Sequence, residues 1–327
     1  MKKIIVTGGC GFIGSHLVEK LSEDKNNYII VIDNLYSGKI TNLPKKKNIK
    51  ILKHDISNNL SSLKKYFKNV DILFHLAALA DIVPSIENPR KYFNTNVNGT
   101  LNLLEISRKF NIKKFVYAGS SSCYGIPSSY PTNENATLST EYPYAASKKM
   151  GEDLVMHWAK VYNINCTSLR LFNVYGPRSR TSGAYGAVFG VFLAQKLKNK
   201  PLTIVGNGQQ SRDFIFVTDV VSAFIKAGNL KKNFEIINIG SSKPVTINYI
   251  ANKISSKKFF IPKRPGEPNI TYANILKAKR MLSWEPKIPI SKGIEIMLKN
   301  IGFWKKSKVW TPFSIKKATK SWFKYLK

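Results

Sequence analysis

The sequence predicts an α/β fold built on a doubly wound parallel sheet. Short β-branched apolar runs alternate with segments of helical periodicity along the first half of the chain. A glycine-rich stretch, TGGCGFIG at 7–14, joins the first apolar run to the first helical segment. With 327 residues and 43% hydrophobic side chains, the chain can bury a large core in one unit or in two closely joined domains.

Six apolar runs are expected to form buried strands, because each is short, β-branched and bounded by polar residues or glycine. They are KKIIVTG at 2–8, YIIVIDN at 28–34, IKILKHD at 49–55, VDILFHLA at 70–77, KKFVYAGS at 113–120 and NCTSLRLFN at 165–173. Helical periodicity lies between them, in FIGSHLVEKLSE at 12–23 and NTNVNGTLNLLEISRKF at 94–110. This alternation of strand and helix is typical of a parallel sheet covered on both faces.

The regular pattern loosens from about residue 173. Loops rich in glycine, proline and polar residues follow at 176–186, at 207–213 and around RPGEP at 264–268. Between them, 214–228 is expected to form a helix and 234–241 a strand that return to the first layer. The predicted organisation is a large unit over 1–172, rejoined by 213–240, a smaller interleaved unit over 173–212 and 241–300, and an extension over 301–327.

The composition limits the function classes. The net charge is +33, from 52 basic and 19 acidic side chains, and could serve nucleic acid, an anionic membrane or an anionic substrate. The excess is mostly lysine spread over the chain without a nucleic-acid-binding motif, which favours a solvated basic surface and predicts no nucleic-acid partner. No window is apolar enough for a membrane helix. Three separate cysteines suggest neither disulfides nor a metal site, so a cytoplasmic protein is expected.

The glycine stretch predicts a dinucleotide site. Gly8, Gly11 and Gly14 allow a tight turn from strand to helix, so that a pyrophosphate can approach the helix N-terminus. Asp33 stands nineteen residues after Gly14 at the end of the second strand. A carboxylate there accepts hydrogen bonds from an adenosine ribose and repels a 2′-phosphate, which indicates NAD rather than NADP.

A second group predicts proton transfer. Tyr144 and Lys148 share a helix face in YPYAASKKM, and a lysine cation beside a tyrosine favours the phenolate and lowers the pKa of the tyrosine. Ser120 ends the fifth strand and is placed to bind the same substrate oxygen. Ser121 and Ser122 are equally consistent with a polar turn.

The order of these motifs resembles the extended short-chain dehydrogenase/reductase family, nucleotide-sugar epimerase/dehydratase group. The similar segments are GxxGxxG, Asp33, HLAALADIVPSIENP, NTNVNGT, SSSCYG, YxxxK, RLFNVYGPR, RDF and RPGEP, over nearly all of residues 1–300. The resemblance implies a Rossmann-type domain that holds NAD, a smaller C-terminal substrate domain that holds a nucleoside-diphosphate sugar, and a homodimer.

Site residues follow from the resemblance position by position. The cofactor residues implied are Gly8, Gly11, Phe12, Ile13, Asp33, Asn34, Asp55, Ile56, Ala77, Ala78 and Lys148. Ser120, Tyr144 and Lys148 are the implied catalytic group, with Tyr144 as general acid and base. The substrate residues implied are Ser120, Tyr144, Asn173, Arg212, Arg264 and Glu267. Arginines suit a diphosphate because they form charge-assisted hydrogen bonds, although a surface salt bridge is the alternative for each of them.

The same resemblance narrows the reaction. Sugar 4,6-dehydratases of the group have Thr-Asp-Glu where this chain has Ser120, Ser121 and Ser122, and the decarboxylases commonly have a glutamate in this stretch. NAD-dependent 4-epimerisation of a UDP-sugar through a 4-keto intermediate is therefore expected. Thr271 occupies a position linked to the acceptance of N-acetylated sugars, which allows UDP-GlcNAc as well as UDP-glucose.

Other functions stay open at this point. A UDP-glucuronate 4-epimerase or decarboxylase, and another nucleotide-sugar reductase or dehydratase, are the nearer alternatives. A non-catalytic basic binding protein is the remote alternative. In the extension, Pro312 is expected to open a helix with Ile315, Trp322 and Leu326 near one face. Docking on the chain itself or across a dimer is favoured there over contact with an anionic membrane.

Overall fold

The computed structural model describes residues 1–181, 188–232 and 234–326. Its centre is a seven-stranded sheet with the order β11-β6-β5-β4-β1-β2-β3, in which every neighbouring pair is parallel. The strands are β1 (Lys2–Thr7), β2 (Asn27–Asp33), β3 (Ile49–Lys53), β4 (Ile72–His75), β5 (Lys114–Ser120), β6 (Cys166–Leu171) and β11 (Glu235–Ile239). The α/β fold with a doubly wound parallel sheet is thus confirmed.

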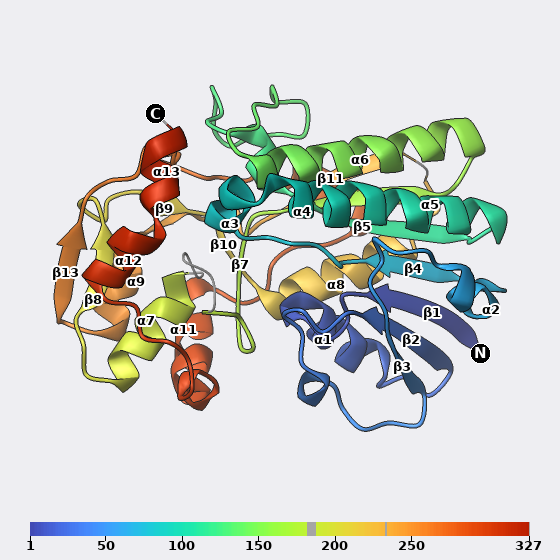
Figure 1. The fold of residues 1–327 in the computed structure, drawn as a ribbon, viewed down its shortest axis with the longest axis horizontal. Coiled ribbons are helices and arrows are strands. Elements are labelled where there is room, and N and C mark those ends of the chain that lie inside the picture. Colours follow the sequence, from blue (N-terminus) through green and yellow to red (C-terminus); the bar gives the residue numbers. More distant parts are fainter. Residues whose placement is uncertain (182–187, 233, 327) are drawn as a thin grey trace.

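Helices cover both faces of this sheet (Figure 1). On one face α1 (Phe12–Leu21) and α8 (Val217–Gly228) pack against alternate strand residues such as Ile4 and Val6. On the other face α5 (Gly99–Lys109) and α6 (Pro143–Tyr162) pack against the residues between them, including Ile5. Successive side chains of a strand point to opposite faces, so the continuous apolar runs fill two cores.

The strand order reverses between β1 and β4. The chain first builds β1, β2 and β3 toward one edge, then returns to the other side of β1 and builds β4, β5, β6 and β11. The short helix α2 (Lys64–Phe67) lies on this return, whereas α3 (Ile82–Glu87) and α4 (Pro89–Phe93) follow β4 and lead into α5. Open α/β sheets bind ligands beyond the carboxyl ends of the strands at such a reversal, which fixes the place of the site.

Three boundaries differ from the sequence predictions. The run at 165–173 divides into β6 and β7 (Asn173–Tyr175), because β7 leaves the main sheet to pair with β10 (Phe214–Phe216). The helix predicted over 214–228 therefore begins only after β10, at Val217. The helix predicted over 94–110 starts with a wider π-helical turn at Asn94–Asn98 before α5.

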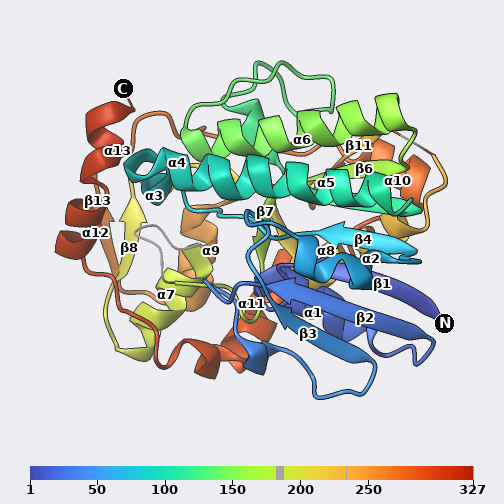
Figure 2. The same ribbon diagram turned by 45° about the vertical axis from the view of Figure 1, so that its right-hand side comes forward.

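The C-terminal portion forms a second body with its own core (Figures 1 and 2). Its strands pair as β8 (Leu202–Val205) with β13 (Lys258–Ile261) and β9 (Ser211–Arg212) with β12 (Val245–Thr246). Helices α7 (Val188–Leu197), α9 (Ile247–Ile254) and α11 (Ile290–Lys299) share one apolar cluster, while α10 (Leu276–Leu282) packs with β11. Residues 182–186 of the predicted loop at 176–186 lie outside the described part. We retain as a proposal that 1–172 with 213–240 is the cofactor unit.

The extension folds back on its own chain. Thr311 caps α12 (Pro312–Ala318) in a reciprocal capping box with Ser314, as the sequence around Pro312 suggests. The single predicted helix is interrupted at Thr319, whose backbone leaves the helical region, and α13 (Lys320–Tyr325) follows. Trp322 is fully buried, and α13 lies beside α3 in both ribbon views.

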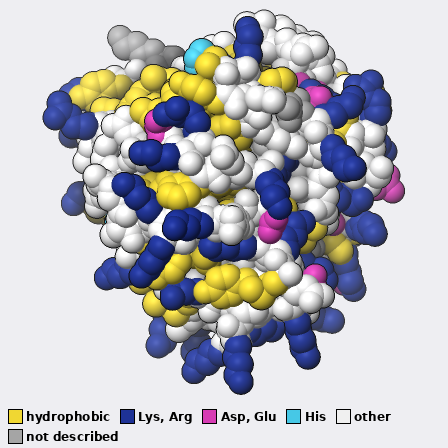
Figure 3. Space-filling view, turned by 90° about the vertical axis from the view of Figure 1, so that its right-hand side faces the viewer, with side chains coloured by type: hydrophobic (Ala, Val, Ile, Leu, Met, Phe, Trp, Pro, Cys, Tyr) yellow, Lys and Arg dark blue, Asp and Glu magenta, His cyan; other side chains and the backbone are white. Residues whose placement is uncertain are grey.

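Basic side chains are dispersed over the surface rather than collected in one place on the face that Figure 3 shows. Lysine and arginine occur over the whole of that face, with apolar patches and few acidic groups between them. Among the described residues, no helix has the length and apolar character needed to cross a membrane.

Candidate active site

One pocket extends from the carboxyl ends of the main strands into the C-terminal portion, with a volume of about 610 Å³. The structure brings every site residue expected from the sequence to its lining. These are Gly8, Gly11, Phe12, Ile13, Asp33, Asn34, Asp55, Ile56, Ala77, Ala78, Ser120, Tyr144, Lys148, Asn173, Arg212, Arg264 and Glu267. The placement agrees with a shared site, while the individual roles remain proposals.

The glycine turn lines the pocket beside the carboxyl end of β1. Gly8 has a φ of +69°, and a side chain there would meet the backbone of Ala77 at 2.7 Å. A side chain on Gly14 would collide with the carbonyl oxygen of Gly8. Helix α1 begins next to this turn, and its N-cap Gly11 offers no side chain to the first helical N–H groups. Free N–H groups at a helix N-terminus fit a pyrophosphate.

Two carboxylates follow at the ends of β2 and β3. The Asp33 carboxylate is fixed by backbone N–H groups, since Oδ2 accepts from Cys10 at 2.9 Å and Oδ1 from Leu35 at 2.8 Å. Asn34 donates to Asp55 Oδ2 at 2.7 Å. Burial works to raise the pKa of Asp55, but hydrogen bonds from Ser57 and Asn34 outweigh it and the pKa is lowered. Fixed acceptors at this edge suit the ribose hydroxyls of an adenosine.

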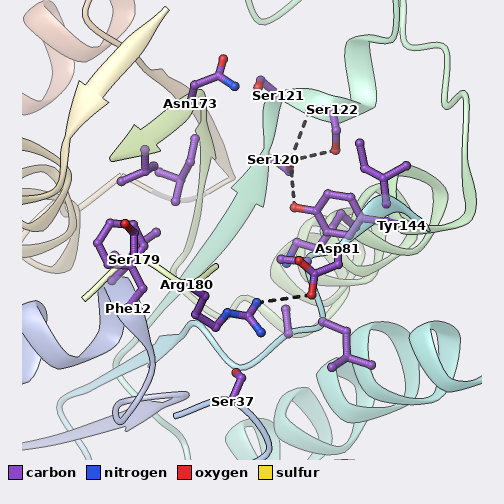
Figure 4. Close-up of a pocket in the computed structure, with 18 of the residues that line it drawn as sticks. Phe12, Ser37, Asp81, Ser120, Ser121, Ser122, Tyr144, Asn173, Ser179 and Arg180 are labelled. Carbon is purple, nitrogen blue, oxygen red and sulfur yellow. Dashed lines mark hydrogen bonds and ion pairs between the residues drawn. The ribbon is translucent and has the colours of Figure 1, made fainter. Parts of the chain in front are cut away.

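Ser120 and Tyr144 meet at the centre of the pocket. The Tyr144 hydroxyl lies 3.2 Å from Ser120 Oγ, and Ser120 Oγ lies 2.8 Å from Ser122 Oγ (Figure 4). Ser120 comes from the end of β5 and Tyr144 from the first turn of α6, so two rigid elements hold the pair. Ser122 is therefore more than a turn residue, because it holds the hydroxyl of Ser120.

The protonation of Tyr144 differs from the sequence prediction. Burial raises the pKa of Tyr144 and outweighs the hydrogen bond with Ser120, which lowers the pKa, while the nearby Asp81 carboxylate adds a smaller rise. Burial also lowers the pKa of Lys148 to about 7, so its cation is only partly present at neutral pH. The expectation that the pKa of Tyr144 is lowered was wrong for the polypeptide alone, because burial disfavours the charged phenolate.

Lys148 is buried, with Nζ 4.1 Å from the ring centre of Tyr117. Its lowered pKa gives a testable dependence of stability on pH. The folded state holds this proton less tightly than the unfolded chain, so unfolding takes up a proton between pH 7 and about 10, and stability rises with pH there.

We expect Lys148→Met to remove this dependence. From pH 7 to pH 9, the free energy of unfolding of the wild type should rise by about 2 kcal/mol relative to the variant. Urea unfolding at several pH values measures the difference, with Lys160→Met, an exposed lysine on the same helix, as the control. A difference that does not change with pH would contradict the assigned pKa.

The polar residues from β7, β9 and the RPGEP loop face the other end of the pocket. Arg264 is buried and pairs with Glu267 at 3.3 Å. Arg212 donates to the carbonyl of Ser211 at 2.9 Å. Thr271 accepts from the backbone N–H of Asp213 and donates to Asn173 Oδ1, both at 2.9 Å. Two arginines and one oriented amide can together hold a diphosphate.

Thr271 thus orients the amide of Asn173. We expect Thr271→Val to raise KM for a UDP-sugar about fivefold, because it keeps the side-chain size but removes one net hydrogen bond of about 1 kcal/mol. Thr271→Ser keeps the hydroxyl and should restore most of the affinity. Steady-state kinetics of the two variants distinguish the hydroxyl from the bulk, and an equal loss in both would contradict the assignment.

Several residues of this pocket were not predicted from the sequence. Arg180 lies 3.7 Å from Asp81, and Figure 4 shows this pair below Tyr144. Asp81 lies in HLAALADIVPSIENP, one of the segments that resemble the family, and Arg180 lies in the predicted loop at 176–186. Their pairing depends on how β7 and the loop after it fold. Tyr142, next to the YxxxK motif, also lines the pocket. Three residues of the extension, Trp310, Ile315 and Trp322, complete this lining. No group of three metal-ligating side chains occurs within the described residues.

The doubly wound sheet, the glycine turn and the Ser120, Tyr144 and Lys148 group together define a dinucleotide-dependent enzyme of the short-chain dehydrogenase type. Comparison with known proteins is consistent with this class. The family model described as the NAD dependent epimerase/dehydratase family matches residues 4–240. The chain belongs to this family, and it is an NAD-dependent nucleotide-sugar epimerase in class.

Three relatives illustrate the similarity. The UDP-glucose 4-epimerase of Mycolicibacterium smegmatis is 32% identical over 303 residues, which cover 89% of this chain and 96% of the relative. The solved UDP-N-acetylglucosamine 4-epimerase of Methanobrevibacter ruminantium is 33% identical with a TM-score of 0.85, covering 91% and 98%. The UDP-glucuronic acid 4-epimerase of Bacillus cereus, solved with UDP-glucuronic acid and NAD, is 33% identical with a TM-score of 0.84, covering 92% and 99%.

Proposed function

We propose that the protein interconverts the C4 epimers of a UDP-sugar, with UDP-glucose or UDP-N-acetylglucosamine as substrate. The observation that carries this proposal is the contact between Ser120 and Tyr144 in the pocket that also contains Asp33 and Arg264. That pocket joins acceptors suited to an adenosine ribose with cations suited to a diphosphate. The relatives named above are 4-epimerases of three different UDP-sugars, which supports the reaction but not one sugar.

Different residues of the pocket have different roles in the proposed reaction. When bound, NAD supplies a reversible acceptor for the hydride on C4. Tyr144 removes the proton of the C4 hydroxyl and later returns it, and Ser120 holds the same oxygen. The cations of Arg212 and Arg264 bind the diphosphate, so the sugar can turn about its link while the nucleotide stays fixed. The 4-keto sugar then takes the hydrogen back on its opposite face, and the overall reaction is redox-neutral.

The residues after β5 disfavour two related reactions. Ser121 and Ser122 stand where the resembling dehydratases and decarboxylases have acidic groups, and Ser122 Oγ is bound to Ser120. A hydroxyl of ordinary acidity does not supply the additional acid and base that water elimination needs. Epimerisation requires only the one proton exchange at O4 that Tyr144 provides.

UDP-glucuronate is the second candidate substrate because of one observation. Arg180 is a cation in the pocket and is only partly exposed, and a cation there can bind the carboxylate of a uronic acid. However, Asp81 already pairs with Arg180 at 3.7 Å and would repel a second carboxylate. This pairing favours UDP-glucose and UDP-N-acetylglucosamine over UDP-glucuronate as the substrate.

The proposal is tested by incubating the protein with UDP-glucose, UDP-N-acetylglucosamine and UDP-glucuronate separately and reading the products by NMR. We expect the matching galacto-configured sugar from a neutral substrate without net formation of NADH. Conversion of UDP-glucuronate alone would select the second candidate. If the protein converts none of the three sugars but still binds UDP, the proposed 4-epimerisation of these sugars is refuted.

We also propose a homodimer in the cytoplasm. The homodimer follows from the family resemblance, and the compartment from the three cysteines, Cys10, Cys123 and Cys166, which are all free and buried. Light scattering of the purified protein measures the number of subunits, and a monomer at micromolar concentration would contradict the homodimer.

A further inference from the structure

Three tryptophans of the extension hold the two loops at the substrate end of the pocket. Each indole N–H donates to a backbone carbonyl of one of these loops. Trp304 donates to Ser179 at 3.0 Å, Trp310 to Thr181 at 2.9 Å and Trp322 to Pro265 at 2.7 Å. All three side chains are buried, with 2%, 6% and 0% of their surface exposed. Because a buried indole N–H is costly without a partner, these bonds fix the extension to the loops.

Trp322 also contacts the charged and aromatic side chains of the pocket. Its ring lies 5.6 Å from the guanidinium carbon of Arg264 and 6.4 Å from the ring centre of Tyr142. Tyr142 in turn stacks on Tyr144, with ring centres 6.3 Å apart and an angle of 8° between the planes. Ser321 donates to Glu87 of α3 at 3.0 Å, which ties the same helix to the cofactor unit.

We propose that Trp322 is a positioning residue for the nucleoside-diphosphate end of the substrate, and that it acts through Arg264. This inference rests on the proposed function. The indole face and the Glu267 carboxylate constrain the guanidinium on two sides, and the bond to Pro265 fixes the adjoining backbone. A planar guanidinium held in this way loses less freedom when it binds a phosphate. The extension is thereby part of the substrate site.

The pair of Arg264 and Glu267 and the pair of Ser120 and Tyr144 are separate groups within the pocket. Arg264 pairs with Glu267 at one end of the pocket, whereas Ser120 and Tyr144 meet at the ends of β5 and α6. We therefore expect Trp322→Ala to weaken the binding of UDP about tenfold and to raise KM for the UDP-sugar by a similar factor. The amount of bound NAD should not change, and kcat should stay within about threefold of the wild type.

Two further variants keep the test decisive. Trp322→Phe retains an aromatic ring beside Arg264 but lacks the N–H that binds Pro265. Its affinity for UDP should therefore lie between those of the wild type and Trp322→Ala. If the alanine variant does not fold, the phenylalanine variant decides the test. Phe323→Ala changes the next residue of α13, whose side chain is 47% exposed, and should bind UDP like the wild type. Thermal unfolding of each variant verifies that the fold is retained.

The experiment is a calorimetric titration with UDP of the wild type, Trp322→Phe, Trp322→Ala, Arg264→Gln and the two double variants. Because Trp322 acts through Arg264, its substitution should have little additional effect in the Arg264→Gln background. Equal losses in both backgrounds, or no loss in folded Trp322 variants, would overturn the inference. A wild type that does not bind UDP would instead refute the proposed function.

Discussion

Tyr144→Phe should lower kcat for the UDP-sugar by about 10³-fold, within the range that proton transfer by a positioned side chain contributes. The phenol is the group that exchanges a proton with the C4 oxygen, and Ser120 holds it at 3.2 Å. Product formation measured by NMR over a range of substrate concentrations gives kcat and KM.

The variant should leave binding intact. Phenylalanine keeps the ring that stacks on Tyr142, so the protein should retain NAD and bind UDP with nearly the wild-type affinity. Tyr162→Phe removes an exposed hydroxyl from the other end of the same helix and serves as the control. Retention of more than a tenth of the wild-type kcat in Tyr144→Phe would exclude this residue as the acid and base.

Gly14→Ala should cause the largest loss of stability among single methyl additions to the glycine turn. The added carbon would collide with the carbonyl oxygen of Gly8 and lie 2.9 Å from the Cα of Gly9, and neither backbone atom can move without opening the turn. Overpacking of a buried position costs about 1–3 kcal/mol, and more where backbone must shift. We expect at least about 3 kcal/mol, with loss of bound NAD.

Thermal unfolding and the NAD content of the purified variant test this prediction. Gly302→Ala is the matched control, because a side chain at Gly302 would meet no atom within 4 Å and should leave both quantities unchanged. A Gly14→Ala variant with wild-type stability and bound NAD would show that the turn is looser than the structure indicates.

The fold and most of the pocket could be predicted because they depend on local patterns. The alternation of Ile4, Ile5 and Val6 between two cores makes a buried parallel strand readable from a continuous apolar run. Strand ends then place residues such as Asp33 and Ser120 at one edge of the sheet. The site residues of the C-terminal portion were predicted from the family resemblance, because their order in the sequence does not show how close together they lie in the fold.

The remaining features depend on long-range packing. Trp322 contacts Arg264 from a second short helix that follows the break at Thr319, and periodicity does not encode that path. The pair of Asp81 and Arg180 joins segments about a hundred residues apart in the sequence. Burial raises the pKa of Tyr144, and the spacing of Tyr144 and Lys148 on one helix face does not show how deeply the phenol is buried.

The most direct test of the central claim is the fate of the hydrogen on C4. The protein is given UDP-glucose or UDP-N-acetylglucosamine deuterated at C4, in ordinary water, and the epimer is analysed by NMR. Direct return of the same hydrogen to the opposite face predicts full retention of deuterium at C4 of the product, with no free NADH. Loss of that deuterium to the solvent would mean that C4 is deprotonated and reprotonated, which would contradict an NAD-dependent epimerisation at this site.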